Sequence, residues 1–381
     1  MDIKYIGFYD VVNSESDRVC NLAAMKKMDY IAESLTRLDY NVEMISPSWM
    51  GKKTKKKFER KSTRTVNKNI KLTLCPSWQT KHKITEKIKI IYSLFWLFQY
   101  LIINAKKGEK ILVYHVEWFS YPIRIAKFIK RFELILEVEE IYSRVWDKSK
   151  LLEKMEKKLI NIADNYIFVS EELQSLFNID ESKSLVLYGA FKSMEINECY
   201  KKDENCINLV YAGSIDDIKG GAFKSLDIIE GLKDGYKLHI LGGGPEEKVI
   251  KLTKRIEEIN KAKNKEVCIY TGILHGQEFD DYLSSCDIAL NPQNMGDYMQ
   301  TAFPSKVISY LGHHLLVLST PIKSIVKSMV RDKIIFTMND KASSFINVID
   351  NINLSSISNK DNIIKELDKK FLKDFKKMLD S

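Results

Sequence analysis

Short apolar runs alternate with amphipathic stretches along most of this 381-residue chain. The run at 3–9, IKYIGFY, has the character of a buried strand, whereas residues 22–35 repeat apolar side chains at helical spacing. The run at 41–48 closes the first such unit, and the alternation resumes from 111 to 189. Short buried strands separated by helices predict an α/β fold with a parallel, doubly wound sheet that helices cover on both faces.

A second alternation follows residue 206. Its expected strands are 208–214, 236–244, 266–272, 287–292, 315–320 and 333–338. The segment before it, 190–206, is polar and has no clear period, and the chain is long enough for two domains of about 150 residues each. The sequence predicts an N-terminal Rossmann-like domain over 1–195, a linker over 196–206, a second Rossmann-like domain over 207–360 and an amphipathic helix over 361–381.

Composition excludes several classes of protein. Hydrophobic residues at 45% and charged residues at 29% are typical of a folded globular chain rather than a disordered one. The six cysteines form no C-x-x-C pair and the six histidines no H-x-x-x-H pair, so no metal site is expected. The opening MDIKYIGFYD lacks the pattern of a secretory signal, which predicts reduced thiols and a cytoplasmic location.

One segment makes the protein basic. Residues 51–90 carry fourteen Lys and Arg against two Glu, and an apolar run follows at 90–103 that is too short to span a bilayer. One interpretation is a solvated loop followed by a buried helix. The other is that 52–103 rests on an anionic membrane surface, at the inner face of the cell membrane. Aromatic residues do not interleave the basic run, so nucleic acid is not an expected partner.

The strand ends of the second half carry the candidate chemistry, because ligands of parallel sheets bind beyond the carboxyl ends of the strands. In YAGSIDDIKGG, Gly213 and Ser214 let the backbone approach a ligand and Lys219 favours an anion. An ordinary βα turn with a surface lysine is the alternative. The turn GGGP at 242–245 does not fit a dinucleotide fingerprint, and the backbone at 272–274 either reads a nucleobase edge or forms a tight turn.

The segment TAFPSKVISYL at 301–311 is the most specific of these. Pro304 fixes the chain as it enters a helix, and Ser305 and Lys306 fall in the first turn, where acids are usual. A lysine that breaks this local preference is typical of functional sites. The sequence therefore predicts that this helix start binds a diphosphate.

With these segments in order, the chain resembles the GT-B nucleotide-sugar glycosyltransferases, in particular the family-4-like retaining enzymes of bacterial surface-polysaccharide assembly. The motifs are YAGSIDDIKGG, LHILGGGP, VCIYTGIL, CDIALNPQ and FPSKVISYL. The resemblance implies two Rossmann-like domains that face a cleft and a final helix that returns to the first domain. The second domain would bind the donor, with no metal and no further cofactor.

The resemblance also assigns roles to residues of the second domain. Lys219, Ser305 and Lys306 would contact the donor phosphates, with Gly213, Ser214 and Pro304 shaping their surroundings. Gly272, Ile273 and Leu274 would lie along the base. The chain departs from the family where its paired glutamates fall on Thr301 and Ser309. Ser309 would keep only a weaker hydroxyl contact, and Asp297 could reach the sugar or be a solvated loop acid.

The first domain offers fewer matches. In YHVEW, His115 occupies the position of the histidine that faces the transferred sugar, and an extended chain would put Glu117 on the same side. A hydrogen-bonded core histidine is the alternative. Glu139 and Glu140 end a strand and are candidates for binding acceptor hydroxyls or acting as base, or for pairing with Arg144. Asn13 completes the expected acceptor side.

The resemblance implies an enzyme that transfers a hexosyl group from a nucleoside-diphosphate sugar, expected to be UDP-linked, with retention. The acceptor would be a lipid-linked or growing glycan of an O-antigen, capsule or exopolysaccharide. A catalytically silent GT-B-like binding protein is the main alternative, motivated by the acids missing at 301 and 309. A membrane-surface scaffold is the third.

Overall fold

The computed structural model describes residues 1–11, 18–51, 54, 56–141, 150–194, 206–352 and 363–381, and omits the side chains of Asp297 and Tyr298. The chain divides into two compact units. Unit 1 comprises 1–169, 173–190 and 371–381, and unit 2 comprises 170–172 and 191–370. Most of the predicted linker, 196–205, lies outside the described residues.

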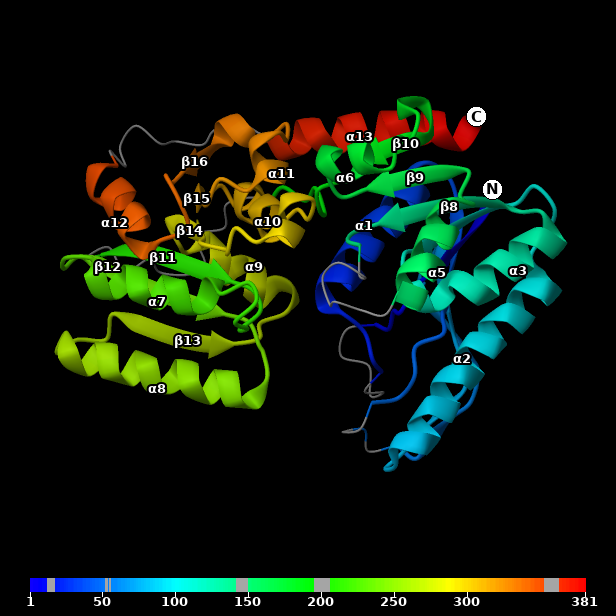
Figure 1. Cartoon of the computed structure of the whole chain (residues 1–381), viewed down its shortest axis with the longest axis horizontal. Helices are drawn as coiled ribbons and strands as arrows, with labels where there is room; N and C mark the ends of the chain where they lie inside the picture. The colour runs from blue at the N-terminus through cyan, green and yellow to red at the C-terminus, as the bar shows by residue number, and fades with distance from the viewer. Residues whose placement is uncertain (12–17, 52–53, 55, 142–149, 195–205, 353–362) are drawn as a thin grey trace. The chain divides into compact units, whose positions relative to one another are not determined.

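Unit 1 is built on an eight-stranded sheet (Figure 1). In spatial order its strands are β10 (Ser184–Val186), β9 (Asn165–Phe168), β8 (Glu133–Val138), β7 (Lys110–Tyr114), β1 (Asp2–Ile6), β2 (Asn41–Ser46), β5 (Ile70–Leu74) and β4 (Ser62–Asn67). β1 lies between β2 and β7, so Ile3 to Ile6 are buried on both faces of the sheet.

The edge of this sheet differs from the prediction. The basic segment is not a simple loop: β4 pairs antiparallel with β5, so the sheet is mixed. β3 (Phe58–Glu59) and β6 (Ser77–Trp78), which flank β4 and β5 in the chain, form a separate two-stranded antiparallel pair. β4 is polar and largely exposed because it is an edge strand, so its apolar pattern is too weak to predict.

Helices cover the sheet of unit 1 and extend beyond it. They are α1 (Leu22–Arg37), α2 (Lys83–Asn104), α3 (Ser120–Lys130), α5 (Lys150–Ile160) and α6 (Glu171–Leu176), with 3₁₀ turns η1 (Glu117–Phe119) and η2 (Glu181–Lys183). The final helix, α13 (Ile363–Asp380), contributes its second half to unit 1. There the ring of Phe371 packs at a tilt against that of Tyr30, with ring centroids 5.6 Å apart, and Lys110 donates to the Leu379 carbonyl at 2.6 Å.

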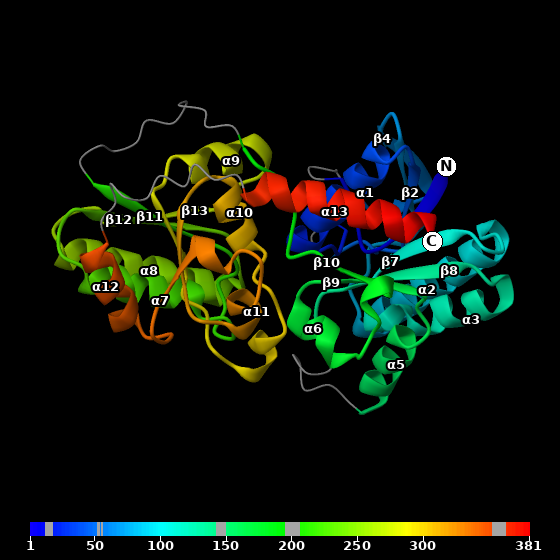
Figure 2. The same ribbon diagram turned by 90° about the horizontal axis from the view of Figure 1, so that it is seen from above.

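Unit 2 is a parallel six-stranded sheet in the order β13 (Cys268–Gly272), β12 (Tyr236–Leu241), β11 (Ile207–Ala212), β14 (Ile288–Asn291), β15 (Leu316–Ser319) and β16 (Ile334–Phe336) (Figure 2). From β11 the chain adds strands in one direction and then returns to add β14 on the other side. The junction of β11 and β14 is therefore the topological switch point, where ligands bind in doubly wound sheets.

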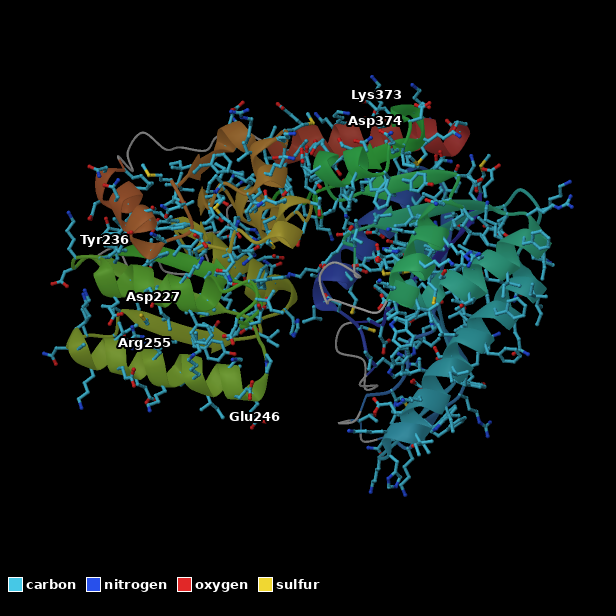
Figure 3. The ribbon with its side chains drawn as sticks, in the orientation of Figure 1. Asp227, Tyr236, Glu246, Arg255, Lys373 and Asp374 are labelled. Atoms are coloured by element: carbon cyan, nitrogen blue, oxygen red, sulfur yellow. The ribbon has the colours of Figure 1, made fainter. Side chains whose placement is uncertain are left out.

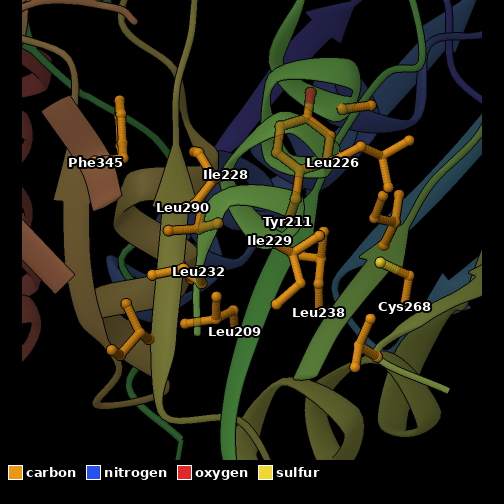
Figure 4. Packing of buried hydrophobic residues seen from close by; sticks show 14 of the residues in the cluster. Leu209, Tyr211, Leu226, Ile228, Ile229, Leu232, Leu238, Cys268, Leu290 and Phe345 are labelled. Atoms are coloured by element: carbon orange, nitrogen blue, oxygen red, sulfur yellow. The ribbon is translucent and has the colours of Figure 1, made fainter. Parts of the chain in front are cut away.

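The helices of unit 2 are α7 (Gly221–Gly231), α8 (Glu246–Ala262), α9 (Gly276–Ser284), α10 (Lys306–Gly312), α11 (Lys323–Val326) and α12 (Ala342–Asn351), with η3 (Asp297–Gln300) and η4 (Arg331–Lys333). The sequence pattern did not predict α11 and α12. Figure 4 shows side chains of α7 packed on the strands, with Leu226 near Tyr211 and Leu209 deeper in the core. On the outside, Arg255 of α8 lies 3.9 Å from Asp227 of α7 (Figure 3).

Candidate functional site

The loops that follow β11 and β14 meet at the switch point of unit 2. The two strands are paired in register, with Val210 opposite Ala289. Beyond the strands, the backbone N–H of Asn294 donates to the Lys219 carbonyl at 3.1 Å, and its side-chain amide donates to the Ile218 carbonyl at 2.8 Å. These bonds hold Lys219 at the carboxyl edge of the sheet, where it forms no ion pair with any described residue.

Lys306 is the most unusual group at this edge. Its Nζ is buried and has no hydrogen-bond partner among the described residues. The Nζ lies 4.0 Å from the ring centroid of Tyr211, and a Cβ placed on Gly213 would lie 2.8 Å from it. Burial, with a smaller contribution from neighbouring Lys219, lowers the pKa of Lys306 to about 7, while Asp216 opposes the shift. An amine that is dehydrated, unpaired and repelled by a second cation is poised to accept an anion.

The position of Lys306 follows from how α10 is anchored. One turn along the helix, the hydroxyl of Tyr310 accepts from the Ala212 N–H at 2.7 Å, and burial raises the pKa of this phenol. This bond ties the helix to the end of β11, next to Gly213. At the other end the Pro304 carbonyl accepts from the Val307 N–H at 2.9 Å. Ser305 makes no side-chain capping bond. α10 has only seven residues, so we assign the expected affinity for an anion to the side chain of Lys306 rather than to the end of the helix.

Glycines allow the neighbouring loops to pack backbone against backbone. Gly242 has φ +131°, and a Cβ there would lie 1.9 Å from the carbonyl oxygen of Gly213. A Cβ on Gly244 would likewise lie 2.2 Å from the Ile215 carbonyl oxygen. Only glycine fits such an approach, so the GGG turn has a structural explanation at these two positions. The backbone at Gly213, Gly242 and Gly244 is therefore closely packed beside Lys306, and we call these three residues the glycine cradle.

The predicted base-binding segment continues this edge. The Gly272 carbonyl accepts from the Gly242 N–H at 2.8 Å, and Gly272 has φ +80° with open space where a Cβ would be. Ile273 is half exposed and reaches over Gly243, and Leu274 is half-buried. The segments containing Lys306, Gly213 and Gly272 therefore form one continuous edge of unit 2.

The positions of the other predicted donor residues do not by themselves indicate a ligand. Ser214 is exposed, and its carbonyl accepts from the Tyr211 hydroxyl at 3.0 Å. Ser309 is half-buried, and its carbonyl accepts from the His313 N–H at 3.1 Å. The Thr301 carbonyl accepts from Ser170 at 2.6 Å. Asp297 begins η3, and its side chain is outside the described part.

In unit 1, the predicted acid Glu139 pairs with a lysine that the sequence analysis did not identify. Lys27 of α1 is buried and donates to Glu139, and its Nζ lies 3.9 Å from Glu137. Burial raises the pKa of Glu137, Lys27 opposes that shift, and the Tyr5 hydroxyl donates to the same carboxyl. Lys27 could have been found from its spacing, since it lies three residues after Ala24 and four before Ile31 on the apolar side of α1. The alternative partner, Arg144, lies outside the described residues.

His115 and Glu117 do not share an extended strand. β7 ends at Tyr114 and Glu117 begins η1, so the extended geometry expected here is absent, although Glu117 lies close enough to influence the charge of the His115 ring. His115 is fully buried, its Nε2 lies 3.7 Å from Glu156, and its backbone N–H donates to the Glu137 carbonyl at 2.8 Å. Burial lowers the pKa of His115 to about 4 although Glu117 opposes the shift, so the ring is neutral at pH 7.

The last two predictions for this side are less defined. Glu140 is half-buried, and Asn13 lies outside the described residues. Among the residues that the structure describes, no group of three or more His, Cys, Asp or Glu side chains is arranged to hold a metal ion. In the same residues, no helix has both the length and the apolar character needed to span a bilayer.

Comparison with solved structures identifies the architecture. The chain matches trehalose-6-phosphate synthase OtsA over 98% of both chains, with a TM-score of 0.70 at 9% identity. It matches Anabaena HepE, solved with UDP and glucose, over 100% of this chain and 98% of that one, with a TM-score of 0.63 at 11% identity. The chain has the GT-B fold.

The match to WaaB, a lipopolysaccharide outer core galactosyltransferase, covers 100% of this chain and 99% of that one, with a TM-score of 0.61 at 14% identity. No protein-family model matches the sequence, and no curated protein does. At these identities the likeness establishes the GT-B fold alone.

Proposed function

We propose that this protein is a glycosyltransferase that moves a hexosyl group from a nucleoside-diphosphate sugar. The observation that carries the proposal is the buried Nζ of Lys306 at the switch point of unit 2, which has no hydrogen-bond partner in the part of the chain that the structure describes. A diphosphate would provide a negatively charged partner for the ammonium group of Lys306, and Lys219 would contact the same diphosphate. UDP is the proposed nucleotide because HepE, which has the same fold, was solved with it.

The chemistry follows from the charge that develops on the leaving group. As the glycosidic bond breaks, the bonding electrons move to the diphosphate, and cations placed there stabilise the transition state more than the ground state. Lys306 is dehydrated and therefore interacts strongly with that charge. In the proposed mechanism the acceptor hydroxyl attacks from the face that the diphosphate leaves, its proton passes to the departing phosphate, and the configuration is retained.

The acceptor is proposed to be a lipid-linked or growing glycan of an O-antigen, capsule or exopolysaccharide. The acceptor-side groups remain the proposed ones of unit 1: His115, Glu117, Glu139 and Glu140. A neutral His115 could accept a hydrogen bond from a sugar hydroxyl through one ring nitrogen, which a protonated ring could not. Glu139, already held by Lys27, would act as a hydrogen-bond acceptor for acceptor hydroxyls.

Calorimetry with UDP tests the phosphate assignment directly. Lys306→Met should weaken UDP binding by about 100-fold, since a charge-assisted bond in a dehydrated site is lost. The matched control is Lys254→Met, which removes an exposed lysine of α8 in the same unit and should leave UDP affinity unchanged. Equal affinities for the wild type and Lys306→Met would show that this amine does not contact the nucleotide.

A panel of nucleotide sugars separates the enzyme from the silent binding protein. Thr301 and Ser309, where the family has glutamates, favour the silent alternative. Release of UDP from one sugar nucleotide, lost in Lys306→Met and kept in Lys254→Met, supports transfer. UDP binding with no turnover of any sugar nucleotide, with and without lipid-linked acceptors, would favour the silent protein.

A further inference from the structure

Two adjacent helices of unit 1 turn apolar faces to solvent. On α2 the exposed side chains recur every three or four residues, at Ile84, Ile88, Ile91 and Phe95. The buried residues of α2, such as Leu97 and Leu101, lie on the opposite face. α2 is thus apolar both where it meets the core of unit 1 and where it meets water, which burial in unit 1 alone does not explain.

α3 and η1 extend the same surface. The exposed apolar residues there are Trp118, Tyr121, Ile125, Phe128 and Ile129, with Phe128 84% exposed. α3 packs against α2, as Figures 1 and 2 show from two directions, and Lys130 donates to the Ile102 carbonyl at 2.9 Å. We name the exposed apolar residues of α2, η1 and α3 the α2–α3 face. Large exposed apolar patches on folded proteins commonly mark interaction sites, and these nine residues stand on neighbouring elements.

Basic residues border the α2–α3 face. Exposed lysines stand at both ends of α2: Lys81, Lys83 and Lys87 at its start, and Lys106 and Lys107 beyond its end. α3 contains no acidic residue, and α2 contains only Glu86. Aromatic and aliphatic side chains surrounded by lysines fit a surface whose headgroups are anionic and whose interior is hydrocarbon.

α13 provides the contrast that makes this face unusual. It is also strongly amphipathic, but its apolar residues Leu367, Phe371 and Phe375 are each less than 5% exposed. Its lysines therefore surround a face that is already covered. The exposed apolar face of α2 has no such cover from the described residues of unit 1.

We propose that the α2–α3 face docks on an anionic lipid bilayer, with Phe128 and the aromatic residues of η1 and α3 entering the headgroup boundary and the lysines of α2 contacting lipid phosphates. The sequence analysis placed this contact on residues 52–103. The present proposal keeps α2 from that range and adds η1 and α3, since within 52–103 Arg64 binds Glu59 and Lys89 is buried against the Met50 carbonyl. η1 and α3, which the sequence analysis did not include, supply five of the nine exposed apolar residues named above.

Co-sedimentation of the full chain with vesicles tests the proposal. Vesicles of phosphatidylcholine containing phosphatidylglycerol should bind the protein, binding should weaken with added salt, and pure phosphatidylcholine should bind less. Ile91→Ser and Phe128→Ser should each lower the partition coefficient by about tenfold, because each removes apolar area from the interface. The control is Ile250→Ser on α8, since Ile250 is 62% exposed and Ile91 66%.

A second pair of variants tests the charges. Lys83→Glu with Lys87→Glu should reduce binding to the anionic vesicles by at least about tenfold. Lys369→Glu with Lys373→Glu makes the same four-residue-spaced change on exposed positions of α13 and should have little effect (Figure 3). Equal losses in the two pairs would leave only net charge as the cause and overturn the proposal.

The competing occupant is a second copy of the chain. Light scattering that shows a dimer dissociated by Ile91→Ser, together with no vesicle binding, would assign the α2–α3 face to self-association instead. UDP affinity measured on the same variants keeps this proposal separate from the donor site: it should not change in any of them.

Discussion

The two units share a doubly wound sheet but treat buried charge in opposite ways. The buried Asp, Glu, Lys and Arg residues among those described all belong to unit 1. There Lys27 meets Glu139, and Arg18 meets Glu59 at 2.8 Å. At the switch point of unit 2 the Nζ of Lys306 is instead buried among glycines and an aromatic ring, with no hydrogen-bond partner among the described residues.

This difference separates charges that organise the fold from a charge that awaits a ligand. A buried ion pair is complete without any further molecule, and removing either partner leaves an uncompensated charge. An unpaired buried amine destabilises the free protein, and such groups concentrate at binding sites.

Breaking the charge pair in unit 1 should cost the most. Lys27→Met leaves Glu139 and Glu137 near each other without their cation, and the expected loss is about 3 kcal/mol in the free energy of unfolding. Urea unfolding followed by tryptophan fluorescence measures it selectively, because all five tryptophans lie in the part of the sequence that forms unit 1, before residue 170.

The matched control is the double variant Lys27→Met with Glu139→Gln, which should recover part of the loss. Burial already raises the pKa of Glu137, and loss of Lys27 should raise it further. A carboxyl with a raised folded-state pKa takes up a proton on folding, so stability falls as pH rises towards that pKa. The single variant should therefore be most destabilised at alkaline pH; a deficit independent of pH would argue against an electrostatic cause.

The glycine cradle of unit 2 offers the next test. Gly242→Ala would force a Cβ against the Gly213 carbonyl and should destabilise unit 2 by about 2–3 kcal/mol. Gly272→Ala keeps a positive φ but meets no atom within 4 Å, so it should cost only about 1 kcal/mol. Hydrogen exchange of peptides from β11 to β14 reports on unit 2, which lacks tryptophan. Equal effects would show that the close backbone approach is not needed.

The sequence predicted most elements of both units because their strands are short apolar runs between helical periods. α10 and the cation in its first turn were also predicted, since Lys306 breaks the usual preference for acids. β4 was missed because an exposed edge strand carries little apolar signal, and α12 was missed as well.

The candidate site was less predictable than the fold. The sequence gives no measure of burial at a single atom, so the isolation of the Lys306 Nζ and its contact with Tyr211 needed the coordinates. The local geometry at Glu117 was not predicted, because β7 ends at Tyr114 and a 3₁₀ turn begins at Glu117. The partner of Glu139 comes from α1, more than a hundred residues away, and a local pattern cannot reveal such a pair.

Lys306→Met should make the protein more stable while weakening the binding of UDP. The lysine is protonated at neutral pH in the unfolded chain, where its ordinary pKa is 10.5, but burial in the folded protein lowers that pKa to about 7. The unfolded state therefore binds more protons between these values, and the wild type gains stability as pH rises from 7 to 10.5. At pH 7.5 the variant should be about 2 kcal/mol more stable.

That advantage should shrink as pH approaches 10.5, where both states of the wild type carry a neutral amine. Hydrogen exchange in unit 2 at pH 7.5 and in alkaline buffer measures both parts of the expectation. Lys254→Met, at an exposed position, should change neither. A destabilised Lys306→Met at neutral pH would mean that the Nζ has a partner in solution.

The smallest effect concerns the pH dependence of UDP binding. Below pH 7 the amine of Lys306 is charged in the free protein, so UDP binds to a cation. Above pH 7 the amine is mostly neutral in the free protein and must take up a proton when UDP binds. Because the bound anion raises the pKa of Lys306, affinity should be flat below pH 7 and fall by up to about tenfold per pH unit above it. Calorimetry in buffers of different ionisation enthalpy should detect up to one proton taken up per UDP bound near pH 8. Lys306→Met should show neither the slope nor the proton, whereas a slope that persists in this variant would assign the titration to another group of unit 2.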